Sequence, residues 1–395
     1  MITPIVRVKN LAVAIALLIG FSLLLPGTLL NGQDNLHQET PQEHPEEVSP
    51  THESDHSEVA HDEEFNATEY ILEHVSDSHD WHILTTKQGH HISVPLPVIL
   101  YSKHSGLHAF SSRKIAHGHN HKGFEMGHGT IQVENKEGEL VDKSLNGKII
   151  EVDSHGEMVE AGLPLDFSIT KNVFMMMLSV IILLWVFLSL ARSYKKMGIS
   201  EPKGLAGFIE PVIVFIEEDI AIPNIGEERY GRFMPYLLTV FFFILLNNLM
   251  GLIPFFPFGA NVTGNIAVTM VLAVFTFLIT QFSSNKGHWQ HVFNTPGVPV
   301  WLAPIMIPVE LIGLITKPFA LMIRLFANIT AGHIIILSLI SMIFIFKSVF
   351  IAVPSLLMVL FMDFIELLVA FLQAYIFTLL SALFIGMAMP EHHHD

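Results

Sequence analysis

Five long apolar segments constrain this chain more than any other feature of its sequence. Each has the length and composition with which an α-helix crosses the hydrocarbon core of a bilayer, about 17–25 residues or more. They are Val173–Ala191, Phe233–Leu252, Ile266–Phe282, the stretch that follows Gly297 and ends at Phe346, and Ser348–Met389. We therefore predict an all-α polytopic membrane protein with about five transmembrane helices.

The last two apolar segments are about twice as long as one perpendicular crossing requires. Helices of such length tilt, kink or run partly in the membrane plane. We predict that they form a long, tilted antiparallel hairpin that turns near Lys347–Pro354. Five crossings, with or without an additional in-plane element, fit the pattern best.

The residues before these segments divide into two parts. Arg7 and Lys9 precede the apolar run Leu11–Leu25, which breaks at Pro26. This layout predicts a cleaved signal peptide over residues 1–33. A first transmembrane helix over Leu11–Leu30 is the alternative, and either interpretation places the following residues outside the cytoplasm.

Residues 34–166 form an acidic, histidine-rich extra-cytoplasmic segment. They hold 25 of the 37 acidic residues and 8 of the 21 basic residues, a local net charge of −17. Asp34–Thr86 contains no Lys or Arg and few aliphatic residues, so we predict that it is largely disordered. From Lys87 to Val159, extended and alternating runs and an Asn-Gly turn predict a small β module. The remainder, 167–395, is the transmembrane domain.

The histidines of this segment raise the question of metal binding. Seventeen of the 23 histidines lie between His37 and His155, with His117, His119 and His121 closely spaced. Imidazole is a common ligand of zinc and copper, but no ligand spacing recurs and no closed tetrahedral pattern is present. We assign no metal site here and regard the segment as a solvated extension.

Several functional classes are excluded by composition. The chain has no cysteine, which excludes disulfide scaffolds and thiolate chemistry, and its net charge of −16 argues against a nucleic acid partner. It has no Walker A loop, no G-x-S-x-G and no H-E-x-x-H motif. We therefore predict a non-enzymatic protein without a cofactor.

Loop charges predict the orientation in the membrane. The loop 192–232 carries Arg192, Lys195, Lys196, Lys203, Arg229 and Arg232, and 283–300 carries Lys286, whereas 253–265 carries no basic residue. Because basic residues stay on the cytoplasmic side, the acidic segment lies outside and the C-terminus lies inside. A bacterial plasma (inner) membrane fits this orientation.

Ionisable and polar side chains interrupt the two longest apolar segments. The first contains Glu310, Lys317, Arg324, Asn328 and His333, and the second contains Asp363, Glu366 and Gln373. Counting from the hairpin turn places His333 and Glu366 at similar depth, with Arg324 and Gln373 deeper. A His–Glu pair titrates near neutral pH, whereas a guanidinium stays charged, so proton handling is favoured. A structural ion pair of Arg324 with Asp363 or Glu366, and a structural His–Glu hydrogen bond, remain alternatives.

Three motifs in these helices resemble subunit a of the F-type ATP synthase. They are KPFALMIRLFANITAGH over Lys317–His333, LLVAFLQAYIFTLL over Leu367–Leu380, and NNLMGLIP over Asn247–Pro254. The resemblance covers roughly residues 170–392, whereas the acidic extension is longer than the usual N-terminus of the family.

The resemblance implies a proton-translocating subunit that supplies two half-channels to a rotating ring of c subunits. It implies that Arg324 faces this ring, that Asn328, Glu310 and Gln373 match polar positions of the aqueous paths, and that His333 with Glu366 is a reciprocal arrangement of the family's Glu and His. The implied partners are the c-subunit ring, the peripheral stalk b subunit and other ATP synthase subunits. A secondary cation/proton transporter and a metal-scavenging membrane protein are the alternatives, but no internal repeat supports the former and Arg324 does not fit the latter.

Overall fold

A computed structural model was used for the structure of the chain. It describes residues 67, 71, 75–85, 91–116, 119–127, 129–134, 140–145, 147–153, 158–159, 163–197, 204–253, 256–293 and 300–389. The predicted signal peptide over 1–33 and most of Asp34–Thr86 lie outside the described residues.

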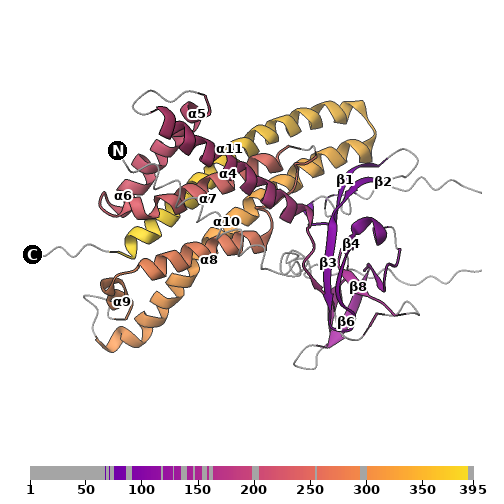
Figure 1. Ribbon diagram of the computed structural model, residues 1–395, viewed down its shortest axis with the longest axis horizontal. Helices are drawn as coiled ribbons and strands as arrows, with labels where there is room; N and C mark the ends of the chain where they lie inside the picture. Colours follow the sequence, from indigo (N-terminus) through magenta and orange to yellow (C-terminus); the bar gives the residue numbers. More distant parts are fainter. Residues whose placement is uncertain are drawn as a thin grey trace, which may run out of the picture.

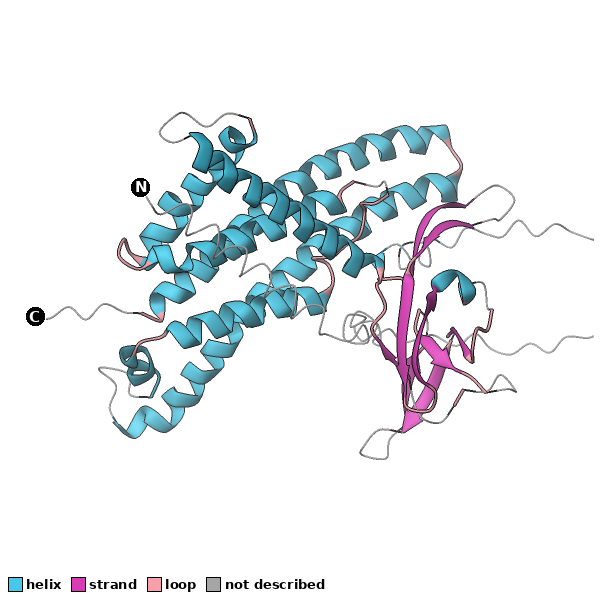
Figure 2. Cartoon of the chain, in the orientation of Figure 1, coloured by secondary structure: helices cyan, strands magenta, loops and turns pink. Residues whose placement is uncertain are grey.

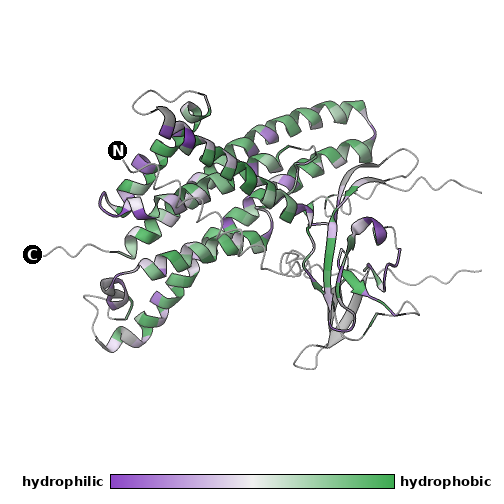
Figure 3. Cartoon of the chain, viewed as in Figure 1, coloured by the Kyte–Doolittle hydropathy of each residue, from purple (hydrophilic) through white to green (hydrophobic). Residues whose placement is uncertain are grey.

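Five helices account for the five apolar segments. They are α4 (Lys171–Met197), α7 (Tyr230–Gly251), α8 (Ile266–Ser283), α10 (Ala303–Phe346) and α11 (Val349–Met387). All five are long and apolar enough to cross a membrane. The prediction of about five helices that could span a membrane is confirmed, and the chain is a multi-pass membrane protein (Figures 1 and 3).

Shorter helical segments lie between these spans. They are α5 (Leu205–Phe215), a π-helical turn (Ile216–Ala221), α6 (Ile222–Ile225), α9 (Lys286–Phe293) and a 3₁₀ turn (Val300–Leu302). The π-helical turn contains Glu217, Glu218 and Asp219, which are too costly to place in hydrocarbon. The segment from α5 to α6 is therefore an additional helical element beside the five spans, and it packs against α7 and α11.

Helix α7 forms the centre of the bundle. Most of its side chains are buried, and it packs against α4 and α11, while α8 packs against α10. Because lipid provides no hydrophobic driving force between helices, close packing and interhelical hydrogen bonds hold such bundles together. Asn247 donates to Ser179 of α4 at 3.1 Å, and Tyr236 shares a hydrogen bond with Thr276 of α8 at 2.7 Å.

The last two helices form the predicted hairpin. Helix α10 ends at Phe346, Lys347 adopts a left-handed conformation with φ of 46°, and Ser348 is extended before α11 begins. Beyond the turn, the Ser355 hydroxyl donates to the Leu339 carbonyl. The turn therefore lies within the predicted interval, and the two long helices pack together along their length.

The residues before α4 fold into small antiparallel sheets (Figure 2). The strands are β1 (Asp80–Thr85), β2 (His91–Pro95), β3 (Pro97–Ser102), β4 (Gly106–Ser111), β5 (Phe124–Met126), β6 (Thr130–Glu134), β7 (Leu140–Ser144), β8 (Ile149–Glu151) and β9 (Leu165–Asp166). They pair as β1-β2, β4-β3-β9, β5-β8 and β6-β7. We call the described residues from 75 to 170 the β module.

A small core holds the β module together. Its buried side chains are Val98, Leu100, Phe110, Ile115, Phe124 and Ile149. The predicted β module is thus confirmed, but it begins earlier than expected. The prediction of disorder is wrong for Asp80–Thr85, because this strand pairs with β2 and the side chain of Trp81 is buried against α4. Among the described residues, no three His, Asp or Glu side chains come together in a way that could hold a metal ion.

The β module is fastened to the start of α4. The ring of Trp81 packs edge-on against Phe174 at 5.8 Å and against Phe256 at 5.5 Å between centroids. Asp77 accepts hydrogen bonds from the Thr170 hydroxyl and from the Asn172 amide. It thereby supplies one of the acceptors that the first turn of a helix requires.

A buried histidine lies at the same junction. His79 Nε2 is 2.6 Å from Asp166 Oδ2. Burial favours the neutral imidazole, but the hydrogen bond and negative charge of Asp166 outweigh it, so the pKa of His79 is raised. Burial acts to raise the pKa of Asp166, but its hydrogen bonds with His79 and Ser168 and the positive charge of His79 lower it overall. Burial raises the pKa of Asp77, which its hydrogen bonds with Thr170 and Asn172 only partly offset.

We predict that this junction is most stable in mildly acidic solution. The stabilising contribution of His79 is fully present below its ordinary pKa of 6.5 and is lost as the pH rises through the raised pKa. The contribution of Asp166 is present above its ordinary pKa of 3.8 and is lost as the pH falls through the lowered pKa. Thermal unfolding of the β module in the purified full-length chain, followed from about pH 6 to about pH 9, should show a falling midpoint.

The matched control is His79→Gln, which keeps a polar side chain but removes the titrating group. Its unfolding midpoint should be lower at about pH 6 and should change less with pH. An equal pH dependence of the two proteins would show that His79 does not link the junction to pH.

Candidate functional site

The α10–α11 hairpin brings together polar residues that lie far apart in the sequence. Glu366 and Gln373 of α11 are buried, and they meet His333 and Asn328 of α10. Because both helices rise by about 1.5 Å per residue, residues at similar distances from the turn lie at similar levels along the hairpin. His333 lies 14 residues before Lys347 and Glu366 lies 18 residues after Ser348, and their contact confirms the prediction that the two lie at similar depth.

His333 and Glu366 form the polar contact of this site that lies nearer to the hairpin turn. His333 Nδ1 lies 3.4 Å from Glu366 Oε1, within ion-pair distance but without the alignment of a hydrogen bond. Neither atom has another hydrogen-bond partner among the described residues. The carboxylate fits here because Gly332 has no side chain, and a Cβ at that position would overlap Glu366 Oε1.

Asn328 and Gln373 form the next contact along the hairpin. The Asn328 amide donates to Gln373 Oε1 at 3.1 Å. From His333 to Asn328 is about 7.5 Å along the helix axis. The two polar contacts thus follow one another along the hairpin, and the Asn328–Gln373 contact is the one farther from the turn.

Arg324 lies one helical turn beyond Asn328 and is exposed on the surface of the protein. Neither Asp363 nor Glu366 pairs with it, and no carboxylate among the described residues lies within 4.0 Å of its guanidinium. Its neighbours Phe319 and Ile323 are also exposed. The structural ion pair that the sequence allowed is therefore absent from the described part of the chain, and the fixed charge faces outward.

His333 and Arg324 point to different surroundings, as their spacing predicts. They are nine residues apart, which is about half a turn around the helix. His333 is half-buried and faces the end of α7, where a Cβ built on Gly251 would lie 4.0 Å from His333 Nε2. The titratable pair is thus directed into the protein, and the permanent charge is directed out of it.

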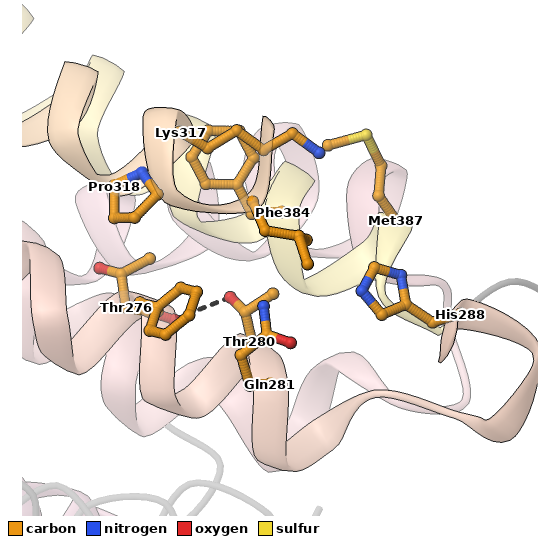
Figure 4. A pocket seen from close by; sticks show the side chains of 10 residues that line it. Thr276, Thr280, Gln281, His288, Lys317, Pro318, Phe384 and Met387 are labelled. Carbon is orange, nitrogen blue, oxygen red and sulfur yellow. Dashed lines mark hydrogen bonds between the residues drawn. The ribbon is translucent and has the colours of Figure 1, made fainter. Parts of the chain in front are cut away.

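Glu310 and Lys317 lie toward the other end of α10. Glu310 is half-buried, and the Lys317 ammonium lies 5.9 Å from the centre of the Phe384 ring. Lys317 lines a small cavity of about 20 Å³ together with His288 and Thr280 (Figure 4). A cavity of this size has room for about one water molecule.

A second group of polar residues, which was not predicted from the sequence, lies close to the His333–Glu366 pair. Thr263 donates to Asn248 Oδ1 at 2.5 Å, and Asn248 Nδ2 donates to the Ala370 carbonyl at 3.4 Å. Thr330 of α10 donates to the Gly264 carbonyl at 3.3 Å. The double asparagine in an apolar helix was the available signal, but the loop that carries Thr263 and Gly264 gave none.

Comparison with known proteins gives two family matches. Residues 173–386 match the family described as ATP synthase A chain. Residues 70–167, which include most of the β module, match a family described as a domain of unknown function (DUF8433).

Similar proteins include ATP synthase subunits a of three organisms. That of Chloroherpeton thalassium is 52% identical over 235 residues, which are 58% of this chain and 69% of the relative. ATP synthase subunit a 2 of Chlorobaculum tepidum is 52% identical over 238 residues, 58% of this chain and 66% of the relative. ATP synthase subunit a 2 of Prosthecochloris aestuarii is 51% identical over 240 residues, 58% of this chain and 71% of the relative.

The family match and the geometry of the hairpin agree. The match spans more than half of the chain and includes every helix that contributes to the polar contacts described above. The chain therefore belongs to the ATP synthase A chain family, the non-catalytic proton-channel subunit of the membrane sector of ATP synthase.

Proposed function

We propose that the α10–α11 hairpin moves protons through two half-channels that are kept apart by Arg324. The observation that carries this proposal is the exposed guanidinium, which has no carboxylate partner among the described residues. A permanent charge at membrane depth requires a partner or water, because hydrocarbon solvates it poorly. We assign this face to the c-subunit ring, which the resemblance implies as the source of the ion-carrying group.

His333 and Glu366 act as the proton relay of the outer half-channel. An imidazole and a carboxylate can each bind and release a proton, and Glu366 is buried next to the imidazole. A proton received by His333 reaches Glu366 by a short transfer or through one water molecule. Asn328 and Gln373 extend the polar path toward Arg324.

Glu310 belongs to the half-channel on the other side of Arg324. It lies 14 residues before Arg324 on the same helix, about 21 Å along the axis. Its half-buried carboxylate can pass protons to or from the aqueous phase at that end. The arginine between the two paths prevents a direct leak, since a proton approaching it is repelled.

The proposed orientation follows from the charges at the two ends of the bundle. The last turns of α4, with Arg192 and Lys195, and the segment from α5 to α6 lie at the end of the bundle where α11 ends, and the β module lies at the opposite end (Figure 1). Arg229 and Arg232 follow α6, and Arg229 donates a hydrogen bond to the Met389 carbonyl just beyond α11. By the positive-inside rule, the C-terminus is cytoplasmic and the β module is outside a bacterial plasma membrane. Within this arrangement, 1–33 is the signal peptide, 34–166 the outer segment and 167–395 the proton-translocating domain.

The proposed partners are the c-subunit ring, the peripheral stalk b subunit and the remaining ATP synthase subunits. The outer faces of α10 and α11 expose many large apolar side chains, among them Phe319, Phe364 and Leu368. In a membrane, such a face is covered by lipid or by other transmembrane helices. The exposed Arg324 favours a helix of a partner that carries an acid.

The first prediction concerns Arg324. In the assembled enzyme, Arg324→Ala should abolish ATP-driven proton pumping and permit a passive proton leak, because the charge that separates the two paths is removed. Arg324→Lys should be nearly as damaging, since an ammonium has a different reach and a shiftable pKa. Pumping and leak are measured with a fluorescent pH probe in inverted vesicles.

Arg192→Ala is the control, because it removes an exposed positive charge at the end of α4. It should leave pumping unchanged. Normal pumping by an assembled Arg324→Ala enzyme would disprove the assigned role.

The second prediction concerns the relay. Glu366→Gln should slow proton flux and alter its pH dependence without loss of assembly, because an amide does not titrate. His333→Glu combined with Glu366→His should recover more flux than either single change, since the relay needs both groups but not their order. A double variant no faster than the slower single variant would refute the pairing.

The third prediction uses the glycine beside the relay. Gly332→Ala should slow proton flux, because the new methyl group displaces the Glu366 carboxylate. Gly313→Ala is the matched control in the same helix, where the new Cβ would meet only Glu310 Oε2 at 3.9 Å. Both changes favour helix formation by up to about 1 kcal/mol, so a difference in flux does not arise from helix propensity. Equal flux in the two variants would show that the position of the carboxylate does not limit transfer.

A further inference from the structure

The three-stranded sheet β4-β3-β9 has one face that the β module does not cover. Tyr101 pairs with Leu107 on one side and with Leu165 on the other, which forms a row of three apolar side chains across the sheet. Leu107 is 70% exposed, Tyr101 47%, Leu165 43% and the following Phe167 41%. Large apolar side chains gathered in this way on one surface indicate a binding face.

Strand alternation shows that this is a distinct face of the sheet. Val98 and Leu100 of β3 point into the core of the β module and are fully buried. The alternate residues Ile99 and Tyr101 point the other way, and Ala109 lies opposite Ile99. The residues of this outer face are Pro97, Ile99, Tyr101, Leu107, Ala109, Ser111, Leu165 and Phe167, and none of them is charged.

The chain connects this face directly to the membrane. Phe167 is followed after four residues by Lys171, where α4 begins, and four extended residues reach at most about 14 Å. At the other end of α4, Arg192 and Lys195 mark the boundary of the hydrocarbon. Twenty residues counted back from Arg192, about 30 Å of helix, end at Asn172, so α4 enters the hydrocarbon where it begins.

The β module is also held close to the bundle. Trp81 is clamped between Phe174 of α4 and Phe256 of the loop after α7. Figure 1 shows β3 running across the direction of the helices, at the end of the bundle where α4 begins. A strand in this direction lies along the membrane surface and does not lead away from it.

We propose that the outer face of the β4-β3-β9 sheet lies on the lipid headgroups beside α4. Tyrosine and other aromatic side chains favour this interface, where an apolar ring and a polar end are both accommodated. Lys103, exposed in the turn between β3 and β4, is placed to meet lipid phosphates at the edge of the face. The β module therefore contacts the surface of the bilayer beside the transmembrane domain.

The absence of cysteine makes a direct test possible. A fluorophore is attached to Leu107→Cys in the full-length chain, which is then reconstituted in vesicles of phosphatidylcholine and phosphatidylglycerol. A lipid with a nitroxide on its headgroup serves as the quencher. We expect the probe at position 107 to lose most of its emission, and Ala109→Cys on the same face to behave alike.

The control is Lys122→Cys, an exposed position beside β5, which packs on the opposite side of the core through Phe124. This probe should keep its emission with the lipid quencher and lose it with iodide in water. Two outcomes would overturn the proposal. If iodide quenches both faces equally, the outer face is open to solvent. If neither quencher reaches position 107, a protein segment covers it, such as the N-terminal residues or a second copy.

Discussion

The cost of holding charge in a medium of low dielectric constant governs the arrangement of this protein. Glu366 is buried, and it lies against His333 in a space that Gly332 leaves open. Arg324 has no such partner among the described residues and faces outward. The same cost therefore explains both features, because a group that titrates can be neutral inside the protein, whereas a guanidinium must find its partner elsewhere.

The junction between the β module and α4 depends on the same principle. The first turn of α4 needs acceptors for its free backbone amides. The carboxylate of Asp77, which lies 95 residues earlier in the chain, accepts a hydrogen bond from the backbone amide of Asn172. His79 and Asp166 form a hydrogen-bonded ion pair in the buried junction. Trp81 packs between α4 and the loop after α7. These contacts join a β module and a helical domain that belong to two different family matches.

Much of the site could be predicted from sequence because helices have a constant rise. Counting from the turn brought His333 and Glu366 to within about one helical turn of the same level, and the packing of α10 against α11 sets their contact. The contact of Thr263 with Asn248 could not be predicted in this way, since Thr263 lies in a loop whose path is set by tertiary packing. The strand Asp80–Thr85 was missed for a related reason, because an acidic composition hides the burial of Trp81 against distant helices.

The sequence by itself determined the number of helices long enough to cross a membrane, the position of the hairpin turn and the order of the polar residues along α10 and α11. These are local properties, fixed by apolar length and helical rise. Only the tertiary structure decided the direction in which each side chain faces. That Arg324 points outward, that Glu366 is buried and that the β module is fastened to α4 depend on packing between distant segments. Local periodicity sets a residue's height on a helix, whereas its surroundings are set by whichever neighbours the fold brings against it.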